Sequence, residues 1–250
     1  MSLNIVAIIQ ARMGSSRLPQ KVMMEIQKKP ILEHVIERVN CSKMITNLVV
    51  ATTDLNEDDQ IASFVKNLKF PVFRGNSTNV LDRFYHCAKK FNADVIVRIS
   101  ADSPLIDAEI IDKCISQFQK NVNADYLSNT INRKNNLILE NYNGFPIGVA
   151  VEVFSFDVLQ KVWVNAKTDS DKEHVTEYIW KHENLFNLDF IEYSKNKSDL
   201  RLVIDYKEDF VYVKKIIETL NIDKLVSLEK ILEMIDKNSS ILHPNLNSGD

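Results

Sequence analysis

Residues 5–23 read IVAIIQARMGSSRLPQKVM, an uncharged apolar run that leads directly into a basic loop with one glycine and two adjacent serines. The first five residues have the aliphatic, largely β-branched composition of a strand that is buried on both faces. Gly14 allows backbone conformations in which N–H groups face an anion. Arg12, Arg17 and Lys21 add three positive charges within ten residues. The stretch therefore predicts a strand followed by a phosphate-binding loop; a basic loop exposed to solvent is the alternative.

Similar apolar runs recur in the first hundred residues, and the segments between them carry apolar residues at helical spacing. This alternation predicts a mostly parallel sheet with helices on its faces, which is the α/β class. Pro30 and Asn79 stand where helices could begin. The predicted strands are Ile5–Ile9, Leu48–Ala51, Val72–Phe73 and Val95–Ile99. Ligands gather at the carboxyl edge of such a sheet, where the polar loops after these strands should converge.

The second half of the chain predicts fewer strands. The expected elements are a strand at Ile147–Phe154, a return to the sheet at Leu202–Asp205, and helices over Phe156–Val164, Glu173–Lys181, Phe210–Leu220 and Leu225–Ile235. The Asn-rich stretch 132–143 has little apolar periodicity and predicts a loop or the start of an arm. We expect one domain over residues 1–238, with an arm or dimerisation excursion at about 130–170. Residues 239–250 are expected to form a flexible tail.

The composition of the chain excludes several classes of protein. A chain of 250 residues with 45% hydrophobic content can bury a sizeable core. Its 31 basic and 34 acidic residues give a net charge of −3, which points to neither a nucleic-acid nor a membrane partner. The N-terminal apolar run is far shorter than the ~20 residues that span a bilayer. Cys41, Cys87 and Cys114 lack paired spacing and predict buried thiols in a reducing compartment, so we expect a cytoplasmic protein.

A second informative stretch, VRISADSPLID, covers residues 97–107. An apolar strand ends at Asp102, and Pro104 stops the chain from continuing as a strand. The Asp102 carboxylate should therefore point out of the strand end. Mg²⁺ prefers such an oxygen ligand and takes one or two carboxylates together with substrate phosphates. Capping of the following turn is the alternative for Asp102, and for Asp107 we favour capping of the next helix.

A partner carboxylate follows a third apolar run, LVID at residues 202–205. Asp205 ends this run just before a predicted helix, and by itself this position favours a cap of that helix. Glu208 and Asp209 fall in the first helical turn, where their charges would interact with the helix dipole.

The basic loop as a whole has the form A-R-x-G-S-x-R-L-P-x-K directly after an N-terminal strand. It resembles the signature loop of the sugar-activating nucleotidyltransferases, in the branch that includes acylneuraminate and 3-deoxy-manno-octulosonate cytidylyltransferases. It is most similar to the family of spore coat polysaccharide biosynthesis protein F. The stretch after residue 202 is similar to the V-D-x-x-E-D element of the same enzymes, and the Asp102 segment to their strand-ending metal aspartate. The resemblance thus involves both ends of the chain.

This resemblance implies a three-layer α/β/α nucleotide-diphospho-sugar transferase fold, which is Rossmann-like. It implies the transfer of CMP from CTP to a sugar or sugar acid, with release of pyrophosphate, for surface polysaccharide biosynthesis. A sugar hydroxyl would attack the α-phosphorus directly, because no nucleophile signature is present in the chain. Mg²⁺ is the implied cofactor and a homodimer the implied assembly.

The resemblance also implies roles for individual residues. Arg12, Lys21, Asp102 and Asp205 would be catalytic, and the two aspartates would bind Mg²⁺. Nucleotide contacts are implied for Ala11, Arg12, Gly14, Ser15, Ser16, Lys21, Gly75, Asn76, Ser77, Asp82, Arg83 and Ala101. Acceptor contacts are implied for Arg98, Glu152, Glu173 and His174. For residues 75–77 a plain turn is the alternative, and for His174 an exposed helical position.

Two positions depart from the family pattern. Gln20 stands where Pro-Gly-Lys is expected, and Ala150 replaces an acid of the expected Gly-x-Asp-Val-Glu. These departures favour one rival hypothesis, a non-catalytic nucleotide-binding module. A nucleotide-sugar-dependent glycosyltransferase of the same fold is the other. The charged run from Glu57 to Asp59 is interpreted as a solvated helix N-terminus.

Overall fold

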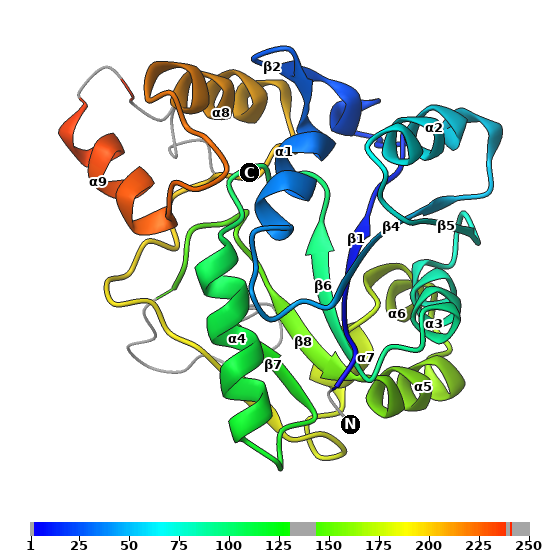
Figure 1. The fold of residues 1–250 in the computed structure, drawn as a ribbon. Helices are drawn as coiled ribbons and strands as arrows, with labels where there is room; N and C mark the ends of the chain where they lie inside the picture. Colours follow the sequence, from blue (N-terminus) through cyan, green and yellow to red (C-terminus); the bar gives the residue numbers. More distant parts are fainter. Residues whose placement is uncertain (1–2, 131–143, 239–240, 242–250) are drawn as a thin grey trace.

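A seven-stranded sheet forms the centre of the protein, whose computed structural model describes residues 3–130, 144–238 and 241 (Figure 1). The strand order is β5-β4-β1-β6-β8-β7-β9. The strands are β1 (Ile5–Gln10), β4 (Asn47–Thr53), β5 (Val72–Gly75), β6 (Val95–Ser100), β7 (Tyr126–Ser128), β8 (Glu152–Ser155) and β9 (Leu188–Phe190). All the pairings are parallel except those of β8, which runs antiparallel to β6 and β7. A separate hairpin pairs β2 (Glu25–Ile26) with β3 (Lys29–Pro30).

Helices cover both faces of the sheet, and β1 shows why. Ile5, Ala7 and Ile9 belong to one buried cluster, while Val6 and Ile8 belong to the other, so the run is apolar throughout. The first cluster includes side chains of α1 (Ile31–Val39), α2 (Asp59–Asn67), α4 (Ala108–Lys120), α8 (Lys207–Thr219) and α9 (Leu228–Lys237). The second includes those of α3 (Val80–Lys90), α5 (Phe156–Asn165) and α7 (Glu177–Lys181). The predicted three-layer α/β/α fold is therefore confirmed.

Several predicted helix starts are confirmed by their caps. Helix α1 begins directly after Pro30. The Asn79 side chain accepts a hydrogen bond from the backbone N–H of Asp82 at the start of α3, and Asp107 does the same for Glu109 at the start of α4. Asp107 is thus the helix cap that the sequence favoured. Among the described residues, no helix is long and apolar enough to cross a membrane.

The predictions for the second half need four corrections. The strand expected at Ile147–Phe154 is shorter in the structure, where only β8 (Glu152–Ser155) forms. Ile147 instead makes an isolated bridge to Arg201. Leu202, Val203 and Ile204 are buried, but the run Leu202–Asp205 forms no strand. The expected helix Glu173–Lys181 is split between α6 (Asp169–His174) and α7, because Val175 has a positive φ of 60°.

The fourth correction concerns the expected excursion at about 130–170. Within this range, β8 lies inside the sheet and α5 packs on it, so these segments are part of the main body. Residues 131–143 lie outside the described residues, as does the predicted tail 239–250 apart from Ile241.

A close backbone approach replaces the expected return strand. Gly148 has a φ of 105°, and a Cβ at this position would collide with the backbone nitrogen of Val203. Only glycine fits so close to another backbone segment. The Ile204 N–H then donates to the Asp102 carbonyl at 3.0 Å. The C-terminal part of the chain is thereby attached to the end of β6, and α8 lies beside the β2 hairpin (Figure 1).

Candidate active site

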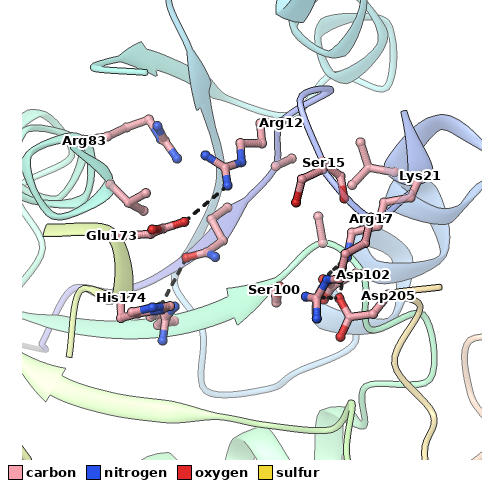
Figure 2. Close-up of a pocket in the computed structure, with 17 residues that line it drawn as sticks. Arg12, Ser15, Arg17, Lys21, Arg83, Ser100, Asp102, Glu173, His174 and Asp205 are labelled. Atoms are coloured by element: carbon pink, nitrogen blue, oxygen red, sulfur yellow. Dashed lines mark hydrogen bonds and ion pairs between the residues drawn. The ribbon is translucent and has the colours of Figure 1, made fainter. Parts of the chain in front are cut away.

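A cavity of about 340 Å³ opens at the carboxyl ends of β1 and β6. Figure 2 shows its two ends: Lys21, Arg17, Asp102 and Asp205 at one, Arg83, Glu173 and His174 at the other, with Arg12 and Ser15 between them. The residues of the sequence prediction that line this cavity are Ala11, Arg12, Ser15, Ser16, Lys21, Arg83, Arg98, Ala101, Asp102, Glu173, His174 and Asp205. Residues from both ends of the chain therefore share one cavity.

The basic loop after β1 folds back on itself and is held by hydrogen bonds to the backbone of Met13. The N–H groups of Ser15 and Gln20 both donate to the Met13 carbonyl, at 2.8 and 2.9 Å. Gln20 has φ 60° and ψ 14°, in the left-handed region where glycine carries no Cβ penalty. Lys21 then begins a short 3₁₀ helix, η1 (Lys21–Met23). Gln20, which departs from the family pattern, thus has a backbone conformation that favours glycine. Lys21 still lines the cavity.

Asp58 is the residue beneath this loop, and sequence reasoning assigned it wrongly. It is fully buried at the end of η2 (Asn56–Asp58), not solvated. One carboxylate oxygen accepts a hydrogen bond from the Met13 N–H at 2.7 Å. The other accepts from the N–H and the hydroxyl of Thr53 at the end of β4. Asp58 thereby ties the basic loop to the neighbouring strand.

Lys21 joins the two predicted metal aspartates. Its ammonium lies 2.6 Å from Asp102 Oδ2 and 2.9 Å from Asp205 Oδ1, and the lysine is 9% exposed. The two carboxylates come from segments that are more than a hundred residues apart in the sequence, yet they converge on a single cation.

Further cations surround Asp205. Arg17 donates to its Oδ1 at 2.9 Å, and Arg201 lies 3.7 Å from its Oδ2. Asp209 accepts hydrogen bonds from the N–H groups of Asp205 and Tyr206 and from Arg201. Burial would raise the pKa of the Asp209 carboxyl, but the hydrogen bonds and the Arg201 charge outweigh it and lower the pKa. Asp209 therefore holds the backbone of Asp205 in place at the start of α8.

The acidic pair fits a divalent cation that is shared with a substrate. Both carboxylates already approach one positive charge, that of Lys21, which shows that their oxygens can meet on a common cation. No group of three or more His, Cys, Asp or Glu side chains forms a metal site within the part of the chain that the structure describes. Mg²⁺ commonly takes one or two carboxylates together with water and substrate phosphates, and Asp102 and Asp205 could supply the carboxylates of such a set.

The opposite end of the cavity is rich in arginine. Arg12 lies 3.6 Å from Glu173, and both side chains are largely exposed. Arg83 is 2% exposed; its Nη1 donates to the Asn76 carbonyl, but its Nε has no hydrogen-bond partner. Burial, followed by repulsion from Arg12, lowers the pKa of Arg83 to about 10. A buried guanidinium with an unused donor at a cavity wall is suited to receive an oxygen acceptor of a ligand.

We predict that Arg83→Met raises the free energy of unfolding by about 1–2 kcal/mol, because it removes a buried charge for which burial outweighs the attraction of the nearby Asp54 and Asp58. Urea denaturation of the variant and of the wild type would measure this difference. Arg74→Met is the matched control, since Arg74 donates to the Thr53 and Leu55 carbonyls and should lose stability on replacement. An equal decrease in the free energy of unfolding in the two variants would contradict the prediction.

Glu152 does not line the cavity, although the resemblance placed it at the acceptor. It is 6% exposed and accepts hydrogen bonds from the Tyr126 hydroxyl at 2.6 Å and the Thr176 hydroxyl at 2.7 Å. It also forms an ion pair with Arg98, which does line the cavity. Glu152 thus orients the Arg98 side chain from outside the cavity. Its hydrogen bond to Thr176 also holds the turn at Val175, next to Glu173 and His174.

Gly14 and residues 75–77 also lie outside the cavity lining, as does Asp82. Asn76 Oδ1 accepts from the N–H groups of Thr78 and Asn79, which is the turn that the sequence allowed as the alternative. Asp82 accepts a hydrogen bond from the Trp163 indole at 3.0 Å. Conversely, Gln10, Arg17, Val22, Val80 and Ser100 line the cavity and were not predicted to do so. Of these, Arg17 was predicted as a charge of the phosphate-binding loop but was given no individual contact.

Comparison with known proteins gives consistent matches over the length of the chain. A family model described as cytidylyltransferase matches residues 6–244. An uncharacterised protein of Methanocaldococcus jannaschii is 40% identical over 98% of this chain and 96% of its own. Spore coat polysaccharide biosynthesis protein SpsF of Bacillus subtilis is 32% identical over 94% of this chain and 95% of its own. The solved structure of a cytidylyltransferase from Leptospira borgpetersenii has a TM-score of 0.88 at 31% identity, and covers 99% of this chain and 100% of its own.

Proposed function

The chain belongs to the cytidylyltransferase family, and we propose that it transfers CMP from CTP to a hydroxyl of a sugar or sugar acid, with release of pyrophosphate. One observation carries the proposal: the basic loop and two aspartates from distant segments meet at one end of a single cavity. Similarity to a spore coat polysaccharide biosynthesis protein supports a role in making a surface polysaccharide.

The basic loop would bind the triphosphate. Arg12 and Lys21 supply positive charge, and Ser15 and Ser16 line the cavity beside them. The acceptor hydroxyl would form a bond to the α-phosphorus while the bond from that phosphorus to the bridging oxygen of the β-phosphate breaks. Negative charge grows on the departing pyrophosphate, where fixed cations stabilise it. Positioning and charge neutralisation would then account for most of the acceleration.

Mg²⁺, which Asp102 and Asp205 would hold, neutralises phosphate oxygens in this type of reaction. The protein itself provides the orientation of the two carboxylates. Asp102 lies two residues after the end of β6, whereas Asp205 is held by Asp209 and by the backbone contact of Ile204 with Asp102. Hydrogen bonds to neighbouring elements thus fix the backbone at both aspartates.

The acceptor would occupy the end of the cavity that Arg98, Glu173 and His174 line. A guanidinium suits a carboxylate, which favours a sugar acid over a neutral sugar. Glu173 accepts hydrogen bonds from sugar hydroxyls, and His174 is the candidate acceptor of the proton that the attacking hydroxyl loses.

A thermal-shift screen with ATP, CTP, GTP and UTP, each with and without Mg²⁺, tests the nucleotide. A ligand present at about 100 times its Kd stabilises the folded state by about 2.7 kcal/mol. For a chain of this size that corresponds to an increase in Tm of about 5–10 °C. We expect this increase for CTP with Mg²⁺ and a much smaller one for UTP. An equal response to all four nucleotides would contradict the assignment of CTP.

Release of pyrophosphate from CTP across a panel of sugars and sugar acids tests the reaction. A glycosyltransferase of the same fold would release no pyrophosphate from CTP, and a non-catalytic module would bind CTP without turnover. The homodimer implied by the family remains a prediction, which light scattering of the purified protein would measure.

A further inference from the structure

We propose that Lys21 and Arg17 hold the acidic pair in place of the divalent cation in the ligand-free protein, and that they exchange Asp102 and Asp205 for the triphosphate when nucleotide and metal bind together. This inference rests on the proposed function. It adds that the metal ion and the nucleotide bind cooperatively, so that neither reaches full affinity without the other.

The contacts of the acidic pair carry the proposal. Lys21 Nζ contacts both carboxylates, at 2.6 and 2.9 Å, and Arg17 contacts the same Asp205 oxygen at 2.9 Å. The side chains of both aspartates are only 17% exposed, and that of Lys21 is 11% exposed. Side-chain cations therefore already contact one oxygen of each carboxylate that would bind Mg²⁺, Oδ2 of Asp102 and Oδ1 of Asp205.

A divalent cation cannot simply be added to this arrangement. An ammonium and a dication held by the same two carboxylates would lie close together and repel each other strongly at low exposure. Lys21 must therefore leave when the metal binds, and its four-carbon stem permits this. Conversely, removal of Lys21 alone would leave two half-buried carboxylates facing each other, which is also unfavourable. The charges are balanced only when the metal ion, which neutralises the two carboxylates, binds together with a negatively charged ligand, which neutralises the released Lys21 and Arg17.

The triphosphate is such a ligand. Ser15 and Ser16 belong to the same loop as Arg17 and Lys21 and line the same cavity, so phosphates bound there lie within reach of both released cations. Metal binding frees these cations, and the phosphates then receive them. The structure thus predicts strong positive coupling between metal and nucleotide, and this coupling must be reciprocal.

Binding of Mn²⁺, measured by electron paramagnetic resonance with and without CTP, tests the exchange. No acceptor is added, so CTP is not consumed by transfer. In the wild-type protein, CTP should tighten Mn²⁺ binding by 10-fold or more. Lys21→Met removes the competing charge, so Mn²⁺ should bind the CTP-free variant at least 10-fold more tightly than the wild type. The gain from adding CTP should shrink in the same variant.

Three further variants serve as controls. Lys29→Met is the matched lysine control, because Lys29 pairs with Glu37 and should leave Mn²⁺ binding unchanged. Asp102→Asn should abolish the Mn²⁺ site. Arg17→Gln should tighten Mn²⁺ binding about threefold, and because Arg17 is half exposed this change does not threaten folding. If Lys21→Met is unstable, Mn²⁺ should raise its Tm more than that of the wild type, which gives a second readout.

Unchanged or weaker Mn²⁺ binding by CTP-free Lys21→Met would overturn the exchange, and so would Mn²⁺ binding that Asp102→Asn does not affect. Either result could occur while the wild type still releases pyrophosphate from CTP, and the proposed function would then stand. In contrast, tighter Mn²⁺ binding by Lys21→Met without selective CTP binding would support the exchange and contradict the nucleotide assignment.

Discussion

Lys21→Ala should lower kcat by about 100-fold or more, because the variant loses a cation that is fixed beside the reacting phosphates. The lysine is nearly buried and lines the cavity together with Ser15 and Ser16 of the same loop, so water cannot replace its charge beside the phosphates. Release of pyrophosphate from CTP, with the acceptor that the screen identifies, is the measurement. The KM for CTP should rise as well, since the lysine also contributes to binding of the nucleotide.

Two comparisons separate this effect from a general loss of structure. Lys29→Ala removes a lysine of the β2 hairpin that pairs only with Glu37, and it should keep near-normal turnover. Lys21→Arg retains the charge in a different shape and should recover part of the activity. Near-native turnover by a folded Lys21→Ala variant would remove Lys21 from the mechanism.

The sheet could be predicted because its first strands are buried on both faces. Such strands need apolar residues on both faces; every residue of Ile5–Ile9 is apolar, and so is every residue of Val95–Ile99 except Arg98, so no tertiary information was required. Helix starts were likewise local, since Pro30 and Asn79 act within one turn of chain. The order and direction of β8, however, depend on contacts with β6 and β7 that leave no mark in the sequence.

Buried acids were the residues that sequence reasoning placed least well. Asp58 was interpreted as a solvated charge and Glu152 as an acceptor contact, yet each is buried and hydrogen-bonded within the protein. Residue type reveals the cost of burying a carboxylate but not the partner that offsets it. The run Leu202–Asp205 was misread for a related reason: its apolar residues are buried against Gly148 and the end of β6, without pairing as a strand. The meeting of Lys21, Asp102 and Asp205 was anticipated only through family resemblance.

Asp58→Ala should lower the free energy of unfolding by about 3 kcal/mol, because it leaves the buried N–H groups of Met13 and Thr53 without acceptors. The effect on function should be separable from stability, since the Met13 N–H anchors the loop that carries Arg12 and Lys21. Urea denaturation would measure the first effect, and the increase in Tm with CTP and Mg²⁺ the second.

The neighbouring residue provides the decisive comparison for Asp58. Asp59 is also acidic, but its side chain is 59% exposed and its ion pair with Arg74 lies at the surface. Exposed ion pairs contribute roughly 0–1 kcal/mol, so Asp59→Ala should have little effect on either stability or nucleotide binding. If both variants lose the same stability, burial of Asp58 is not what fixes the loop. If Asp58→Ala loses stability but keeps the full response to CTP, the loop is held in place by its own hydrogen bonds to the Met13 carbonyl, and Asp58 serves the fold alone.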